Sequence, residues 1–304
     1  MVFENSLKKY KKERAFYNRI RHSGTWLQKR FGFPEPSEQK GTTMAKEKNA
    51  VAVKSENAVA VNDDFFSSVA GSGLENVRSN DLIIPRLTLL QALSPQVQPK
   101  KPEYIMGAQV GDICDVGTQE IFEAPLLFLP VHYVKQYLEW APRSSGKGLV
   151  AIHDDPSIVD QASRDEKNKL TLPNGNLLAE TAQFFGLNLS AGGRRCFLPL
   201  TSTQLKKAKR WLTFASAERA KRADGTSFVP PLYYRVYNLS VVDESNAEGD
   251  WAGWKIERGP KLQEFSTDWQ EIFAEAKSFK ESIARGEVRG DVGADEDHAG
   301  ESAM

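Results

Sequence analysis

The fold is decided by residues 194–257, which read RRCFLPLTSTQLKKAKRWLTFAS (194–216), a polar insert, and PPLYYRVYNLSVVDESNAEGDWAGWKIE (230–257). Apolar residues at three- and four-residue spacing predict a helix from Thr203 to about Ala223. Flanking segments of strand character predict one strand at Arg195–Leu200 and a hairpin formed by Leu232–Val242 and Trp251–Glu257. The order of elements in this stretch is therefore strand, helix and hairpin.

Further strands are predicted on the N-terminal side of this stretch. Leu178–Leu189 precedes a Gly192–Gly193 turn, Ala124–Val134 is a short continuous apolar run, and Gly107–Cys114 resembles a turn with a short strand. Residues 141–178 form a polar excursion with a small helix near Pro156–Arg164, whereas Leu82–Leu93 fits helix and strand equally. A closing helix over Thr267–Arg285 carries a Thr-x-x-Gln capping box. The pattern predicts a mainly β fold with α, namely a partly open oligonucleotide-binding (OB)-like barrel with one internal helix and a C-terminal helix packed outside.

Composition divides the 304-residue chain into four parts. We expect a basic N-terminal extension (1–43), a disordered linker (44–79), the OB-like domain (80–286) and an acidic disordered tail (287–304). Residues 1–40 hold ten Lys or Arg and four Glu, whereas residues 281–304 hold two Arg and seven acids. Met44 resembles a second beginning, because codons for Lys40 and Gly41 can form a purine-rich ribosome-binding stretch. We therefore expect much of the functional protein to start at Met44.

Several classes of protein are disfavoured by composition. The two cysteines and four isolated histidines supply neither a disulfide framework nor a metal-ligand set, so we expect no cofactor and a reducing, cytoplasmic compartment. No apolar run approaches the roughly 18 residues of a membrane span, and the basic N-terminus lacks the apolar region of a secretory signal. No serine or cysteine sits in a nucleophile motif, and the acidic pairs lie in predicted loops. We therefore expect no enzymatic activity and no membrane association.

Aromatic and basic residues of the hairpin predict a surface for single-stranded nucleic acid. Alternation places Tyr233, Arg235 and Tyr237 on one strand face, and it assigns Tyr234 and Val236 to the core. Base stacking on such rings contributes about 1–3 kcal/mol per base. Trp251 and Lys255 share a face of the second strand, whereas Trp254, like Trp211 of the helix, is assigned to the core. The alternative interpretation is an ordinary exposed strand face with amphipathic tyrosines.

Basic residues of the helix predict contacts with phosphate. Lys206, Lys207, Lys209 and Arg210 lie within five residues, where like charges repel unless an anion compensates them. A solvated lysine face is the alternative. Arg194 and Arg195 follow the Gly192–Gly193 turn, and a third cluster, Tyr137, Trp140, Arg143 and Lys147, ends in a Gly-Ser-Lys loop that can close over a strand. The predicted nucleic-acid-binding residues are Tyr137, Trp140, Arg143, Lys147, Arg194, Arg195, Lys206, Lys207, Lys209, Arg210, Tyr233, Arg235, Tyr237, Trp251 and Lys255.

Four phrases of the sequence resemble phage-encoded single-stranded DNA-binding proteins: DLIIPRLTLLQALSPQV (81–97), LFLPVHYVKQYLEWAPR (127–143), CFLPLTSTQLKKAKRW (196–211) and LYYRVYNLSVVDESNAEGDWAGWKI (232–256). The resemblance implies an OB barrel that protects single-stranded DNA in phage replication or recombination, in the host cytoplasm. It also implies that the acidic tail recruits replication or recombination proteins, although DVGADEDHAGESAM (291–304) lacks the terminal aromatic residue often found there. The alternatives are a mediator of transcription or recombination that holds DNA while recruiting a partner, and a structural or assembly protein of the virion.

Overall fold

The computed structural model describes residues 72–76, 83–165, 169–247 and 249–290. The chain divides into two units, a smaller one spanning Lys9–Arg78 and a larger one made of Met1–Lys8 and Ser79–Met304. Of the smaller unit, only the turn at 72–76 is described. The predictions for residues 1–43, for the start at Met44, for nearly all of 44–79 and for the acidic tail beyond Gly290 lie outside the described residues.

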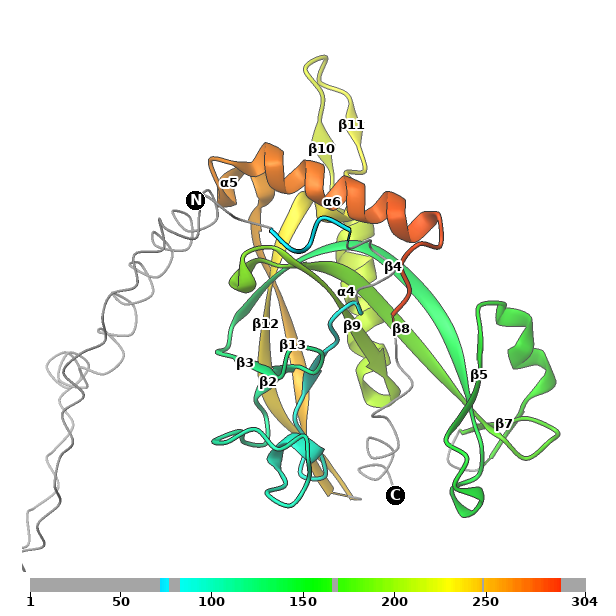
Figure 1. Cartoon of the computed structure of the whole chain (residues 1–304). Coiled ribbons are helices and arrows are strands. Elements are labelled where there is room, and N and C mark those ends of the chain that lie inside the picture. Colours follow the sequence, from blue (N-terminus) through cyan, green and yellow to red (C-terminus); the bar gives the residue numbers. More distant parts are fainter. Residues whose placement is uncertain (1–71, 77–82, 166–168, 248, 291–304) are drawn as a thin grey trace, which may run out of the picture. The chain divides into compact units, whose positions relative to one another are not determined.

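Five antiparallel strands of the larger unit form a curled, partly open barrel (Figure 1). They are β4 (Leu126–Trp140), β8 (Leu177–Asn188), β9 (Arg194–Thr201), β12 (Arg235–Asn246) and β13 (Gly249–Lys261). The long β4 pairs with both β8 and β12, β9 pairs with β8, and β13 pairs with β12. One helix, α4 (Leu205–Ala217), lies between β9 and β12 in the sequence. A three-stranded meander, a helix and a hairpin make a barrel of the OB type, so the predicted fold is confirmed.

The bend between β4 and β8 depends on a glycine. A Cβ atom at Gly186 would lie 2.4 Å from Cζ of Phe128 and 2.5 Å from the carbonyl oxygen of Leu129. The register of β4 on β8 shifts beside this contact, between Pro130 and His132, as a bulge requires. Only glycine lets the two strands approach closely enough for this curvature.

The seam of the barrel is closed by side chains. A small sheet of β1 (Leu87–Leu89), β2 (Ile113–Asp115) and β3 (Glu120–Phe122) meets β9 through a parallel bridge between Arg86 and Phe197. On the other side of the seam, the Gln91 amide accepts from the Ala252 N–H at 3.0 Å and donates to its carbonyl at 3.0 Å. The Trp254 N–H donates to Oε1 of Gln204 at 3.0 Å. Two glutamine side chains thus satisfy backbone groups of β13 that a further strand would otherwise pair.

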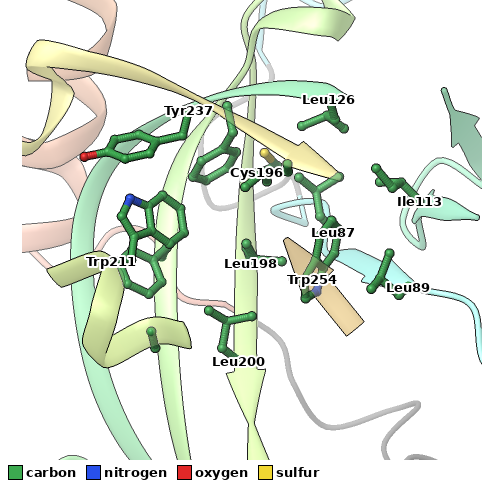
Figure 2. Packing of buried hydrophobic residues seen from close by; sticks show 14 of the residues in the cluster. Leu87, Leu89, Ile113, Leu126, Cys196, Leu198, Leu200, Trp211, Tyr237 and Trp254 are labelled. Carbon is green, nitrogen blue, oxygen red and sulfur yellow. The ribbon is translucent and has the colours of Figure 1, made fainter. Parts of the chain in front are cut away.

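The barrel core is organised around Trp211 of α4 (Figure 2). Its ring stacks on Phe184 with centroids 4.1 Å apart and meets Phe128 and Tyr237 edge-on at 5.9 and 5.1 Å. Trp254 is buried in the same cluster. The assignments of Trp211 and Trp254 to the core are confirmed. Helix α4 ends earlier than predicted, because the chain turns at Glu218 into a small hairpin of β10 (Ala220–Lys221) and β11 (Ser227–Phe228).

Two helices follow the barrel, α5 (Leu262–Phe265) and α6 (Trp269–Ala284). Helix α6 packs on the outer face of β8 and β9, where the Phe279 ring lies 6.3 Å from that of Phe185 and Arg195 bonds Glu275 at 2.7 Å. The closing helix is therefore confirmed. Its predicted capping box is wrong, since Asp268 occupies the N-cap position and makes no side-chain capping bond.

The far ends of β4 and β8 extend beyond the barrel as an arm, seen at the right of Figure 1. The predicted polar excursion forms the tip of this arm and contains β5 (Leu149–His153), β6 (Ser163–Arg164) and β7 (Leu170–Thr171). Tyr137, Leu170, Leu172 and Leu178 form a second small core there. Short 3-10 turns complete the described elements: η2 (Pro95–Val97), η3 (Arg143–Ser145), η4 (Pro156–Gln161), η5 (Leu189–Ala191), η6 (Ser202–Gln204) and η7 (Leu232–Tyr234). Across the described residues, no helix is long and apolar enough to cross a membrane.

Candidate nucleic-acid interface

The two tyrosines predicted to stack on bases are buried. Tyr237 is 2% exposed and lies inside the barrel against Trp211, and Tyr233 is 7% exposed with its ring 5.1 Å from that of Phe273 on α6. The prediction that both rings face solvent is therefore wrong. Leu232–Tyr234 form a 3-10 turn, so the strand begins only at Arg235, and both Val236 and Tyr237, which follow on its two faces, are buried. Tyr234, which was assigned to the core, is only half-buried.

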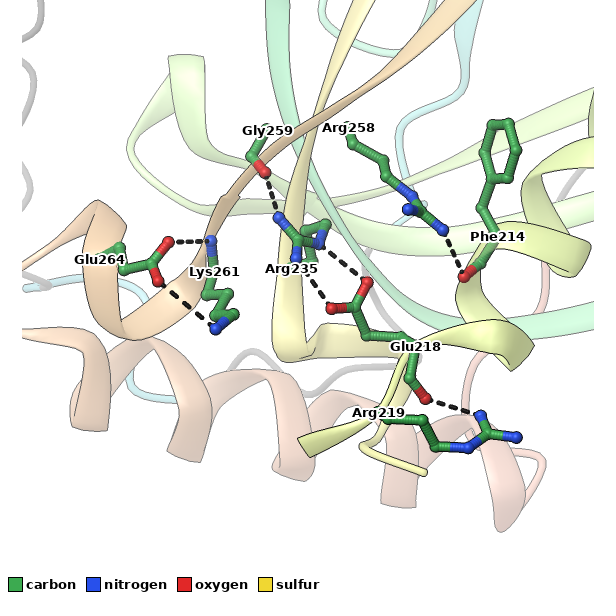
Figure 3. Close-up of polar contacts among 8 residues, drawn as sticks. All are labelled: Phe214, Glu218, Arg219, Arg235, Arg258, Gly259, Lys261 and Glu264. Atoms are coloured by element: carbon green, nitrogen blue, oxygen red, sulfur yellow. Dashed lines mark hydrogen bonds and ion pairs between the residues drawn. The ribbon is translucent and has the colours of Figure 1, made fainter. Parts of the chain in front are cut away.

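Arg235 is held by the end of helix α4 (Figure 3). Its guanidinium donates to both carboxylate oxygens of Glu218, at 2.8 and 3.2 Å, and to the carbonyl of Gly259 at 2.6 Å. The hydrogen bonds from Arg235 lower the pKa of Glu218 despite partial burial. Arg235 therefore joins the helix to the β12–β13 hairpin, and its charge is compensated within the protein.

Trp251 and Lys207 converge on Glu244. The Trp251 Nε1–H donates to Oε2 of Glu244 at 3.0 Å, Lys207 Nζ lies 2.7 Å from Oε1, and Gln204 donates to Oε2 at 2.8 Å. Burial alone would raise the pKa of Glu244, but these bonds outweigh it and the pKa is lowered. The carboxylate lies against Gly253, where a Cβ atom would come within 2.2 Å of Oε2. This arrangement compensates Lys207 and fixes the edge of the Trp251 indole, which is half-buried.

Three more of the predicted cations form ion pairs at the surface. Arg194 bonds Glu120 at 2.7 Å, Arg195 bonds Glu275 at 2.7 Å, and Lys255 meets Glu257 at 2.9 Å. Arg195 also lies over the Phe279 ring at 5.1 Å, beneath α6. Their charges are locally balanced, which weakens the attraction that each exerts on a phosphate.

The arm holds the predicted Tyr137, Trp140, Arg143 and Lys147. Tyr137 is buried in the arm core, with Lys135 Nζ 5.2 Å from its ring centroid, so this ring is not available for stacking. Trp140 is half-buried and Lys147 is exposed. Arg143 begins turn η3, and its side chain lies outside the described residues. The arm thus separates these residues from those of α4 rather than presenting one surface.

The remaining predicted cations, Lys206, Lys209 and Arg210, are exposed on α4. Ala208 and Trp211 point into the core, which leaves these three on the solvent side of the helix. After the helix, further exposed cations lie on and beside the β10–β11 hairpin, and one lies on β13. We call the set the basic strip: Lys206, Lys209, Arg210, Arg219, Lys221, Arg222 and Arg258. Within the described part of the chain, none of its seven members forms an ion pair with an acidic side chain.

Most of the chain matches a known protein family. Residues 53–289 match the family model of the Pam3 phage gp34-like protein. The chain belongs to this family. No curated protein and no solved structure matches it. The phage part of the resemblance is therefore supported, whereas single-stranded DNA binding stays a prediction.

Phe214 and Phe228, two aromatic residues that lie against arginines of the basic strip, were not identified from the sequence. Two guanidinium groups lie against the Phe214 ring, that of Arg210 at 5.2 Å and that of Arg258 at 4.8 Å from its centroid. Arg258 also donates to the carbonyl of Phe214 at 3.0 Å, near the end of α4 (Figure 3). Arg222 covers Phe228 in the same way at 4.8 Å. The only signal in the sequence was the phase of α4, which places Phe214 one turn after Arg210.

The described residues hold neither a cluster of metal ligands nor a reactive cysteine. No three His, Cys, Asp or Glu side chains gather there as a metal site requires. Cys114 and Cys196 are buried, and burial raises the pKa of the Cys196 thiol far above its usual range. A protonated, enclosed thiol is a poor nucleophile.

Proposed function

We propose that this phage-family protein binds single-stranded DNA without sequence preference, through the basic strip. The proposal rests on seven exposed cations that form no ion pair within the described residues and that lie on the internal helix α4, on and beside the β10–β11 hairpin, and on β13. Backbone phosphates supply most of the affinity in sequence-independent binding, and each needs an uncompensated cation. The thirteen residues of α4 alone span about 20 Å, long enough to follow several nucleotides.

The strip favours single strands because its cations are interleaved with aromatic rings. Guanidinium planes and rings accept unstacked bases, which a duplex does not expose at its surface. Arg210 and Arg258 present such planes beside Phe214, and Arg222 presents one on Phe228. In many OB proteins the ligand lies on the face of the second and third barrel strands. Here α6 covers the equivalent face of β8 and β9, which supports a site on α4 instead.

Titration of fluorescein-labelled oligo-dT, followed by anisotropy, tests the proposal. We expect tight binding at low salt, weaker binding to a duplex of the same length, and little difference between oligo-dT and a mixed sequence. Absence of binding to oligo-dT, or equal affinity for the duplex, would overturn the proposal. A magnesium-dependent change in oligonucleotide length would instead reveal a nuclease.

A further inference from the structure

Strand β5 stands out among the edges of the large sheet. Edges of a sheet pair readily with other chains unless they are short, charged or covered. The β13 edge is covered by the Gln91 and Gln204 side chains, and β9 is bridged by Arg86. Strand β6 has only two residues, one of them Arg164. In the described sheet, β5 alone is a five-residue edge with neither charge nor proline nor cover, since it pairs only with β4.

The side chains of β5 add an apolar surface to this open edge. Val150 is 51% exposed and Ile152 is 44% exposed, and alternation places both on one face of the arm. Leu177, which lies on the same face across β4, is exposed as well. The opposite face of the arm is covered by Ile158 and its neighbours in the second small core. An open edge and two exposed apolar side chains, Val150 and Ile152, therefore coincide at β5.

We propose that β5 pairs antiparallel with β5 of a second copy of this chain, about a twofold axis at Ala151. The sequence KGLVAIHDD (147–155) is complementary to itself in this register. Val150 then lies opposite Ile152 of the other copy, and directly opposed residues share a face. The two apolar faces merge into one, and the contact is isologous, as a twofold axis requires.

Charge complementarity at the two ends of the strand favours a second copy over another partner. Lys147 lies just before β5 and Asp155 just after it, so antiparallel pairing brings the cation at one end of each strand near the anion of the other copy, and the twofold axis repeats this arrangement. Lys147 and Asp155 are both exposed, and neither forms an ion pair within the described residues. The side chain of Asp155 accepts from the N–H of Ser157, which holds it at the start of η4. In any other register, either Val150 no longer lies opposite Ile152 of the other copy, or Lys147 no longer lies near its Asp155.

Cross-linking tests the axis directly. Opposed residues in an antiparallel pair have Cα atoms about 4.5–5.5 Å apart, within the range that a disulfide bridges. With oxidised glutathione as the oxidant, Ala151→Cys should give a covalent dimer. The native Cys114 and Cys196 are buried and should not contribute. Val229→Cys, at an exposed position just after β11, is the control. Equal cross-linking of the two variants indicates random collision and overturns the proposal.

Sedimentation velocity of the full chain without DNA measures self-association and tests whether it depends on the β5 edge. A contact of two five-residue strands is small, so we expect self-association in the micromolar range. Ile152→Lys should weaken it at least about tenfold, whereas Val229→Lys, at a residue 56% exposed, should not. Lys147→Gln and Asp155→Asn should each weaken it about 2- to 10-fold, an effect that disappears at high salt. A chain that stays monomeric at all concentrations, or a dimer that Ile152→Lys leaves intact, would refute the pairing.

Discussion

Removing charge from α4 should flatten the salt dependence of DNA binding. For single strands, the slope of log K against log salt is about −0.7 for each phosphate neutralised. Seven cations in the basic strip set an upper limit of about −4.9 for the proposed complex. Affinity should then fall about 900-fold between 50 and 200 mM salt.

The perturbation is the triple variant Lys206→Gln, Lys209→Gln and Arg210→Gln. These side chains point to solvent from α4, so the barrel core stays intact. Four strip cations remain, the limiting slope becomes about −2.8, and the loss of affinity over the same salt range falls to about 50-fold.

The assay is anisotropy of labelled oligo-dT at four or more salt concentrations. The matched control is Lys100→Gln, Lys101→Gln and Lys277→Gln, which removes the same charge from exposed lysines outside the strip. We expect the control to keep the slope of the unmodified protein. If both triple variants change the slope equally, net charge rather than the strip governs binding, and the assignment of the site is wrong.

Three further predictions concern stability. Trp211→Ala removes a buried ring that packs on Phe184, Phe128 and Tyr237, and it should cost about 3–5 kcal/mol in urea denaturation; a cost below about 1 kcal/mol would contradict its central place in the core. Gly186→Ala forces a methyl group against Phe128 and should destabilise the fold by about 1–3 kcal/mol by the same measurement, whereas Gly117→Ala, whose Cβ atom would meet nothing closer than 3.4 Å, lacks that clash. Because the bonds from Arg235 lower the pKa of Glu218 below its ordinary 4.5, their stabilisation is complete above that pH and is lost as pH falls through the folded-state pKa. The difference in melting temperature between the unmodified protein and Glu218→Gln should therefore shrink on acidification, and a difference that stays constant down to pH 3 would rule this out.

Local pattern was sufficient for most elements of the barrel. The helix beginning near Leu205 and the strands β8 and β9 follow from apolar periodicity, and a turn between Ser245 and Asp250 matches the β12–β13 hairpin. Strand order was not predictable, because it depends on which edges of β4 are used, and β4 pairs on both. The end of α4 was missed because Ala220 and Lys221 pair with residues of the same loop, a contact that helix periodicity does not reveal.

The candidate site was harder to predict than the fold. Alternation found the correct period in β12 but assigned the wrong face to Tyr237, since both faces of that strand are covered near its start. Val236 on one face and Tyr237 on the other are both buried. Ion pairing was also invisible, because Glu244, Glu218 and Glu275 reach their cations from distant parts of the chain. The exposed lysines of α4 were predictable because helix phase alone sets their direction.

Because α6 covers β8 and β9, part of the outer surface of the barrel is buried. Phe185, Phe197 and Gln183 occupy strand positions that point away from the barrel interior, yet all three are buried. Their allowed substitutions should therefore follow side-chain volume, as at interior positions, and not the identity of any ligand. A chain cut before Trp269 would expose this apolar layer and should aggregate. Helix α6 and the outward side chains of β8 and β9 thus form a second packed layer of the domain. Substitutions in β8 and β9 should therefore be accompanied by compensating changes of side-chain volume in α6.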